Sequence, residues 1–218
     1  HTLIGNNGLT IGDLASFWQA IAKEFSTFKN IYGYGLMNEP HDLTPETSWF
    51  DMAQASINAI REVDTNTLIM VGGNDWSSAE RWIEQSDTLK YLKDPANNLA
   101  FEAHVYFDKD ASGTYKYSYE EEECYPEKGI DRVKPFVEWI KQNKFHGFIG
   151  EYGIPDNDPR WNETLDLFLG YLQENGINGT YWAAGPWWDS YFMAITPKDG
   201  KDRPQMPIIE KYTSTLKK

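Results

Sequence analysis

Cysteine, basic residues and long apolar runs are all scarce in this 218-residue chain. A single cysteine, Cys124, excludes a disulfide within the chain. No apolar run reaches 18 residues, so no membrane-spanning helix is predicted. Lys and Arg number 20 against 33 Asp and Glu, giving a formal net charge of −13. This charge disfavours nucleic acid and anionic membranes as partners, because both bind basic surfaces. A neutral or cationic ligand fits better.

Several motifs of catalysis and ligand binding are also absent. No G-x-G-x-x-G turn follows an apolar segment, and no G-x-S-x-G elbow is present for a serine nucleophile. The acidic run at residues 118–127, which contains Cys124, lacks the Asp-x-Asp-x-Asp-Gly pattern of a calcium loop. No H-E-x-x-H pattern is present for a zinc site. The sequence therefore predicts neither a metal nor a cofactor.

Five segments have the composition of β-strands: residues 30–39, 67–73, 99–107, 145–153 and 179–188. Stretches with helical periodicity alternate with them. Thr10 and Asp13 resemble a capping box, and Leu14, Phe17 and Ile21 follow on one helical face. Alternating strands and helices predict an α/β fold, in which helices cover a parallel sheet.

Further helices are predicted from the same spacing. Thr44, Pro45 and Glu46 resemble the start of one helix, and Gly176 resembles the end of another. The apolar stripes or short helical stretches lie at residues 50–60, 78–85, 133–140, 165–172 and 207–216.

Polar and aromatic residues stand at the carboxyl end of every predicted strand: Asn38, Glu39, Asn74, His104, Tyr106, Glu151 and Trp182. Such a spread favours a (β/α)8 TIM barrel over an open doubly wound sheet, whose site lies at one switch point. A full barrel needs eight strands and about 250 residues. We therefore expect residues 1–218 to form a single catalytic domain carrying strands four to eight. The chain begins HTLIGNNG, and strands one to three are expected to belong to a longer protein.

Glu39 and Glu151 each end an apolar strand, GLMNEP in one and FIGEYG in the other. Strands four and seven face each other across a barrel mouth, so the two carboxyl groups are expected to converge there. Two carboxyl groups flanking a bond are what glycoside hydrolysis requires: one protonated, the other ionised. The alternative is that each glutamate only ends a strand in water, paired with a lysine.

The neighbouring polar residues suit supporting roles. His104 and Tyr106 are two apart on one strand and point to the same side, where the tyrosine hydroxyl could bind a carboxylate. Asn38 could hold a sugar hydroxyl, and Pro40 is expected to keep Glu39 extended. The alternatives are a core histidine and tyrosine, and an asparagine that caps a turn.

Aromatic residues near the strand ends could stack on sugar rings. Trp76 follows Asn74 after the second predicted strand, and Trp182, Trp187 and Trp188 cluster at the last one. Trp182 is assigned to the site, whereas for the other three packing in the core is an equally good interpretation.

Five segments together resemble glycoside hydrolase family 5, and within it the secreted endo-β-1,4-glucanases, or cellulases: GLMNEPHDL (35–43), VGGNDWSSAERW (71–82), FEAHVYFDKDASGT (101–114), GFIGEYGIP (147–155) and YWAAGPWW (181–188). The resemblance runs from about residue 9 to the C-terminus. It implies a retaining enzyme that needs no cofactor, with Glu39 as acid/base and Glu151 as nucleophile.

The same resemblance implies a set of supporting residues: Asn38, His104, Tyr106 and Trp182, with Asn74 and Trp76 in the substrate-binding loop. It also implies a cis peptide between Trp182 and Ala183, a β-glucan substrate and secretion. The family's early-strand arginine and its histidine-bearing third strand have no counterpart in this chain. We expect residues 1–218 alone to be unstable or oligomeric, and the N-terminal barrel segment could be a separate chain.

Two alternatives to the glucanase stay open from the sequence. Another β-1,4-glycanase of this fold could act on mannan, xyloglucan or mixed-linkage glucan. A barrel fragment could instead bind carbohydrate without catalysing hydrolysis.

Overall fold

A computed structural model of the chain describes residue 4, residues 8–43 and residues 47–213. The chain divides into two compact units. Unit 1 comprises His1–Ala103 with Trp139–Gly147, and unit 2 comprises His104–Glu138 with Phe148–Lys218. The predicted single domain over residues 1–218 stays a prediction. No helix in the described part of the chain is long and apolar enough to cross a bilayer.

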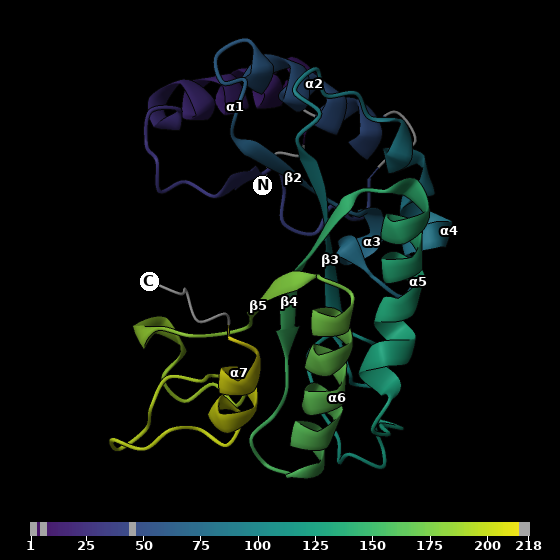
Figure 1. The fold of residues 1–218 in the computed structure, drawn as a ribbon, viewed down its shortest axis with the longest axis vertical. Helices are drawn as coiled ribbons and strands as arrows, with labels where there is room; N and C mark the ends of the chain where they lie inside the picture. The colour runs from purple at the N-terminus through teal and green to yellow at the C-terminus, as the bar shows by residue number, and fades with distance from the viewer. Residues whose placement is uncertain (1–3, 5–7, 44–46, 214–218) are drawn as a thin grey trace. The chain divides into compact units, whose positions relative to one another are not determined.

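The strands form one sheet in the order β1-β2-β3-β4-β5, which is also their order along the chain. Figure 1 labels β2, β3, β4 and β5. The pairs β1 with β2, β2 with β3 and β4 with β5 are parallel. A doubly wound sheet would reverse its strand order at a switch point, whereas a barrel keeps it sequential. The bounds are Gly33–Gly35, Leu68–Gly72, Leu99–Tyr106, His146–Gly153 and Asn178–Tyr181.

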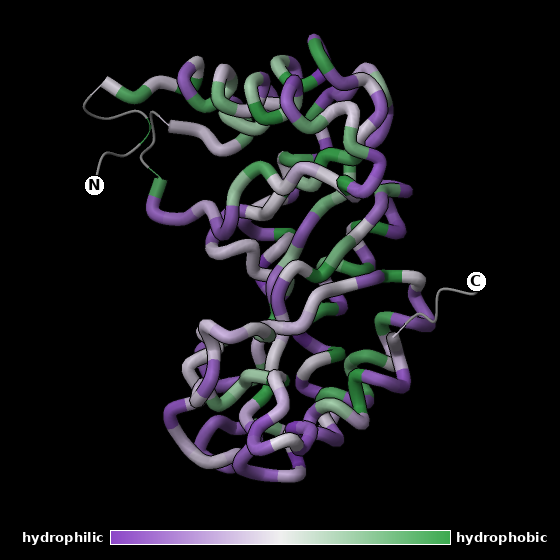
Figure 2. The backbone as a smooth tube through the Cα atoms, turned by 90° about the vertical axis from the view of Figure 1, so that its left-hand side faces the viewer, coloured by the Kyte–Doolittle hydropathy of each residue, from purple (hydrophilic) through white to green (hydrophobic). Residues whose placement is uncertain are grey.

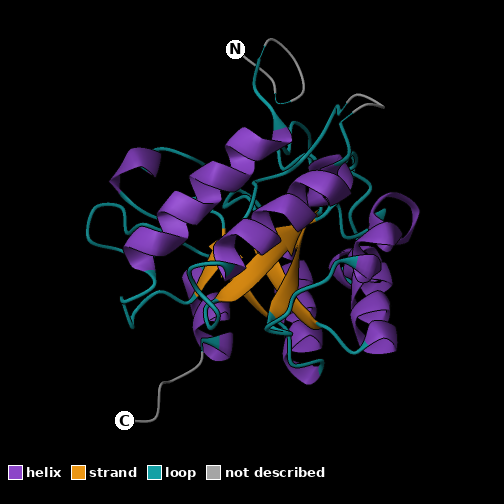
Figure 3. Ribbon diagram, turned by 90° about the horizontal axis from the view of Figure 1, so that it is seen from above, coloured by secondary structure: helices purple, strands orange, loops and turns teal. Residues whose placement is uncertain are grey.

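Helices alternate with these strands along the chain. Figure 3 distinguishes the helices from the strands by colour. Most helices mix polar and apolar residues, so one face can pack while another meets water (Figure 2). The helical elements are α1 (Ile11–Phe25), α2 (Trp49–Arg61), α3 (Asn74–Ser77), α4 (Trp82–Ser86), η1 (Asp87–Tyr91), α5 (Lys128–Asn143), α6 (Arg160–Glu174), η2 (Pro186–Trp188) and α7 (Met206–Tyr212).

Capping patterns in the sequence correctly predicted the start of α1 and the end of α6. The capping box of Thr10 and Asp13 starts α1, as predicted. Gly176 follows α6 with a φ of +66°, which confirms the predicted left-handed end. Ser48, which was not predicted as a cap, caps α2 by accepting a hydrogen bond from the backbone N–H of Asp51. The start predicted at residues 44–46 lies outside the described residues, as do residues 214–216 of the last predicted helix.

Three predicted segments were too long. The first strand spans only Gly33–Gly35 rather than residues 30–39. Residues 78–81 are not α-helical, and α4 begins only at Trp82. The last strand ends at Tyr181 rather than at residue 188. Gly185 has a φ of +113°, and Pro186 has no backbone N–H, so the sheet ladder cannot continue through them.

In unit 1, a cluster of aromatic rings joins β3 to the helices. Phe101 of β3 packs edge-on against Trp139, with ring centroids 4.9 Å apart, and Trp139 packs against Trp82 at 5.5 Å. Gly73 lies so close that a Cβ there would come 2.5 Å from the Trp82 ring. Only glycine therefore fits where β2 leads into α3.

In unit 2, the core fixes which face of each strand meets the helices. Phe107, just after β3, and Tyr152 of β4 both pack against Phe168 of α6, at 5.2 and 5.4 Å. Because side chains alternate along a strand, Tyr106 and Glu151 point to the opposite face. The core thereby directs the side chains of Tyr106 and Glu151 away from α6.

Candidate active site

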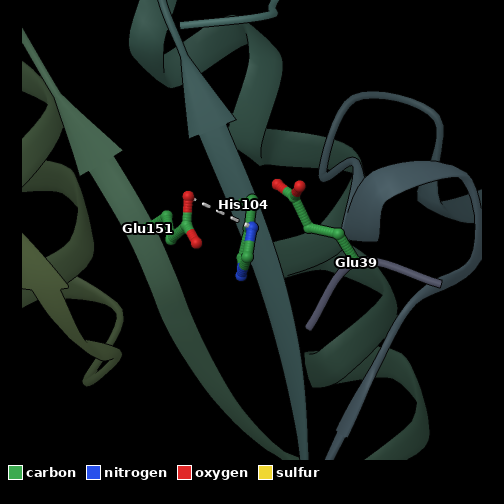
Figure 4. A group of neighbouring side chains, drawn as sticks. All are labelled: Glu39, His104 and Glu151. Atoms are coloured by element: carbon green, nitrogen blue, oxygen red, sulfur yellow. Dashed lines mark ion pairs between the residues drawn. The ribbon is translucent and has the colours of Figure 1, made fainter. Parts of the chain in front are cut away.

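Three predicted site residues of unit 2 meet on β3 and β4. The Tyr106 hydroxyl donates a hydrogen bond to Glu151 Oε2 at 2.6 Å. His104 Nδ1 lies 3.7 Å from the same oxygen, and this ion pair requires a protonated imidazole (Figure 4). The predicted placement of His104 and Tyr106 on one side of their strand is therefore confirmed. Their contact with Glu151 makes a compact acid–base cluster.

The surroundings of this cluster keep Tyr106 a hydrogen-bond donor. His104 and Tyr106 are 5% and 7% exposed, and Glu151 is half-buried. Burial first, and the adjacent Glu151 second, raise the pKa of Tyr106 well above its usual value. The phenol therefore stays protonated, and its O–H favours the ionised form of Glu151. An ionised carboxylate held at a fixed angle can act as a nucleophile or as a base.

Trp182 directly follows β5 and adjoins this cluster in unit 2. Its backbone N–H donates to the Tyr152 carbonyl at 2.8 Å. The peptide bond to Ala183 is cis, as predicted from the family resemblance. The Trp182 ring packs against Trp188 at 4.8 Å, and Trp188 packs against Tyr191 at 5.0 Å. These rings form an aromatic wall beside β5.

The other tryptophans differ in exposure. Trp187 is 89% exposed, so the interpretation that it packs in the core is wrong, and its role in stacking on a sugar ring stays a prediction. Trp188 is half-buried within the wall.

In unit 1, Asn38 and Glu39 follow β1, Asn38 exposed and Glu39 half-buried. The expectation that Pro40 keeps Glu39 extended was wrong, because Glu39 has a φ of +47°. Pro40 is buried, with its Cδ 3.6 Å from where a Cβ of Gly72 would stand. Packing of Pro40 against the end of β2 thus outweighs the local preference for extended backbone. Such conformations of non-glycine residues are concentrated at functional sites.

Asn74 and Trp76 lie in the turn after β2, also in unit 1. The Asn74 amide donates to the Gln85 carbonyl at 2.8 Å, so it holds the end of α4 in place. The Trp76 ring stacks on His41, with centroids 4.5 Å apart and an angle of 11°. Trp76 is 42% exposed. The role predicted for Asn74 and Trp76 in substrate binding stays a prediction.

This turn is left-handed over three successive residues. Asp75, Trp76 and Ser77 have φ values of 54°, 57° and 54°. Asp75 pairs with Arg81, and the Trp76 N–H donates to the Pro40 carbonyl at 3.3 Å. These contacts fix an arrangement that an isolated peptide would avoid.

Sequence reasoning missed two tyrosines of unit 2. Burial is the main cause that raises the pKa of Tyr191, and the Glu151 carboxylate raises it further. Tyr191 therefore lies within electrostatic reach of that carboxylate. The Tyr115 hydroxyl contacts the backbone of both Phe107 and Gly153. Neither residue ends a strand, and no motif spacing marks them, because only tertiary contacts bring them near Glu151. The pairing of Glu39 with Glu151, and the absence of a metal or cofactor, stay predictions.

The chain resembles known proteins over most of its length. The family model described as cellulase (glycosyl hydrolase family 5) matches residues 1–187. Endo-beta-1,4-glucanase B of Emericella nidulans is 36% identical over 193 residues, which are 86% of this chain and 56% of that protein.

Solved structures of endoglucanases are also similar to this chain. Pseudomonas stutzeri endoglucanase Cel5A in complex with cellobiose has a TM-score of 0.90 and 42% identity, and the match covers 98% of this chain and 64% of that one. XacCel5A in complex with cellopentaose has a TM-score of 0.86 and 38% identity, over 96% of this chain and 68% of that one. The α/β fold class is thereby confirmed, with five parallel strands that match part of a (β/α)8 barrel. The chain spans about three-fifths of the length of these relatives.

Proposed function

This chain belongs to glycosyl hydrolase family 5, the cellulase family, and on this basis we propose that it acts as a retaining endo-β-1,4-glucanase. The observation that carries the proposal is the 2.6 Å hydrogen bond from Tyr106 to Glu151 at the end of β4. A nucleophile must be ionised and fixed in direction, and a buried phenol donor provides both conditions. The activity proposed is that of the whole protein that carries these residues.

The proposed reaction is a double displacement. The Glu151 carboxylate attacks the anomeric carbon, the bond to the glycosidic oxygen breaks, and Glu39 gives its proton to that oxygen. Glu39, now ionised, removes a proton from water as the water oxygen attacks the same carbon. The ester bond to Glu151 then breaks and releases the sugar. Two inversions leave the anomeric configuration unchanged.

The proposed substrate is a β-1,4-glucan. Support comes from relatives: two solved structures contain cellobiose and cellopentaose, and the curated relative is an endo-beta-1,4-glucanase. The exposed Trp76 and the half-buried Trp182 offer apolar faces of the kind on which pyranose rings stack. Because such a polymer cannot enter a cell, we propose that the protein works outside it.

Azide rescue tests the two glutamate roles separately. With 2,4-dinitrophenyl β-cellobioside and azide, Glu151→Gly should yield α-cellobiosyl azide, because azide replaces the missing nucleophile in a single inversion. Glu39→Ala should yield the β-azide, because the glycosyl-enzyme still forms on Glu151. Each variant is the matched control of the other. A Glu151→Gly protein that yields no α-azide, from a wild type that hydrolyses the cellobioside, would contradict the assignment.

Substrate choice is tested by comparing carboxymethyl-cellulose with mannan, xyloglucan and mixed-linkage glucan. Faster release of reducing ends from carboxymethyl-cellulose, with a rapid fall in viscosity, is expected for an endoglucanase. Faster hydrolysis of mannan would replace the proposal with a mannanase. Binding of cello-oligosaccharides without turnover would indicate a carbohydrate-binding protein instead.

A further inference from the structure

One hydroxyl in unit 2 joins the two strands that carry the Tyr106–Glu151 pair. The Tyr115 hydroxyl accepts a hydrogen bond from the Phe107 N–H at 2.9 Å and donates one to the Gly153 carbonyl at 2.6 Å. Phe107 directly follows Tyr106, and Gly153 lies two residues after Glu151. A single oxygen therefore connects the carboxyl ends of β3 and β4, next to the residues that share the 2.6 Å hydrogen bond.

Tyr115 is held rigidly enough to act as such a bridge. Its ring is buried and packs edge-on against Trp161, with centroids 4.9 Å apart and an angle of 87°. Its backbone N–H donates to Asp108 at 3.2 Å. The fully buried Asp108 carboxylate also accepts the N–H groups of Gly113 and Thr114, at 3.1 and 3.0 Å. The loop after β3 is thus organised around one buried carboxylate.

The same loop contacts the Tyr106 ring directly. Gly113 has a φ of +72°, and a Cβ there would stand 2.9 Å from the Tyr106 ring. The loop therefore presses against the ring of Tyr106 while Tyr115 fixes the backbone just after it. Both contacts limit the freedom of the Tyr106 hydroxyl relative to Glu151.

The Tyr115 hydroxyl is protonated, as the bridge requires. Burial first, and the nearby Asp108 second, raise the pKa of Tyr115 well above its usual value. An intact O–H can donate to Gly153 while the oxygen accepts from Phe107. Removing the hydroxyl therefore takes one hydrogen-bond partner from the Phe107 N–H and one from the Gly153 carbonyl.

We propose that Tyr115 is a positioning residue, which sets the Tyr106–Glu151 hydrogen bond by tying the end of β3 to the end of β4. Its relevance to catalysis rests on the proposed function, because it acts through the nucleophile Glu151. Misplacement of a catalytic group by about 1 Å can lower the rate about 100-fold, so a bridge at this point has a measurable effect.

The first test is spectroscopic and needs no turnover. In the whole wild-type protein that carries these residues, the Tyr106 hydroxyl proton, assigned with Tyr106→Phe, should give a proton resonance protected from exchange with water. Tyr115→Phe keeps the ring and removes the bridge, so this resonance should broaden or disappear. Tyr117→Phe is the matched control, the same substitution in the same loop at a residue 61% exposed, and should leave it unchanged.

The second test is kinetic. Tyr115→Phe should lower kcat on cello-oligosaccharides about tenfold with KM within about twofold, because substrate contacts remain while the nucleophile is misplaced. Circular dichroism and a thermal melt verify folding of each variant. If Tyr115→Phe does not fold, 4-fluorophenylalanine at position 115 keeps the size of the para substituent but cannot donate to Gly153.

The results of these two tests distinguish the positioning role of Tyr115 from the proposed endoglucanase function. An unchanged Tyr106 hydroxyl resonance in a folded Tyr115 variant overturns the positioning role, as does equal loss in Tyr117→Phe. If the wild type does not hydrolyse glucan, the proposed function fails, and the resonance still decides whether Tyr115 positions Tyr106.

Discussion

At the scale of single residues, the hydrogen bond between Tyr106 and Glu151 is the interaction on which the chemistry depends. A carboxylate buried without a donor would bind a proton, whereas a fixed phenol O–H favours its charge. Tyr152, the next residue along β4, points to the helix layer and packs on Phe168. Tyr106 of β3 and Tyr152 of β4 point to opposite faces of the sheet and thus have different roles.

We expect Tyr106→Phe to lower kcat/KM about 10- to 100-fold, because a hydrogen bond to a charged group contributes about 1.5–3 kcal/mol. Since this hydrogen bond stabilises the ionised form of Glu151, its loss should move the acidic limb of the pH–rate profile to higher pH. Tyr152→Phe is the control and should leave both quantities near those of the wild type. A Tyr106→Phe profile that overlays the wild type would refute this role.

The left-handed backbone conformation of Glu39 leads to a second prediction for a single residue. Glu39 has a φ of +47°, at which the backbone of any residue with a Cβ is strained and that of glycine is not. Glu39→Gly should therefore have a free energy of unfolding about 1 kcal/mol above that of Glu39→Ala, measured by urea denaturation. Both lack the carboxyl group, so their difference isolates the backbone. Equal stability, or a more stable alanine variant, would show that the turn is not strained.

At the scale of secondary-structure elements, the turn between α2 and β2 depends on one buried aspartate. The Asp64 carboxylate accepts from the Asn66 N–H, from the Thr67 N–H and hydroxyl, and from the Tyr34 hydroxyl on β1. Burial alone would raise the pKa of Asp64, but these hydrogen bonds outweigh it and lower the pKa to about 2. The carboxylate therefore ties the turn to the neighbouring strand.

This pKa predicts an acid-dependent loss of stability. Because the folded pKa of about 2 lies below the unfolded value of about 3.9, the stabilisation is complete above about pH 5 and is lost as the pH falls towards 2. The contribution should be about 2 kcal/mol. Urea denaturation of Asp64→Asn between pH 2 and pH 5 should show a smaller decline than the wild type. As a control, Asp202→Asn removes the same charge at an exposed residue and should follow the wild-type curve.

At the scale of the whole chain, apolar surface remains exposed on α1. In the described part of the chain this helix buries only Ala22, although its sequence is amphipathic. Phe17, Phe25 and the nearby Phe28 are 56%, 37% and 51% exposed. Exposed apolar patches of this kind promote association.

We predict that residues 1–218 alone self-associate at micromolar concentration, as measured by sedimentation velocity. Replacing Phe17 and Phe28 together by glutamate should shift the distribution towards monomer, because charge would interrupt the apolar surface. Lys23→Glu, on the same helix, serves as the control and should not. A wild-type chain that is monomeric with a cooperative thermal melt would contradict the prediction.

Much of this molecule follows from local sequence patterns. Apolar runs separated by amphipathic stretches determine the parallel α/β class and the order of its elements. Alternation along a strand places His104 and Tyr106 on one side, and a residue that ends an apolar strand lies at the carboxyl edge. These properties depend on periods of 2 and 3.6 residues, which a sequence displays directly.

Tertiary structure alone decided the contacts between segments that are distant along the chain. Pro40 packs on Gly72 and turns Glu39 left-handed, against its local preference. The Asn74 amide binds Gln85 and fixes a helix end. Tyr115 reaches the ends of both β3 and β4 because Asp108 folds the intervening loop back over them. Such contacts leave no periodic signal, because they depend on which surfaces meet when the sheet and its helices pack.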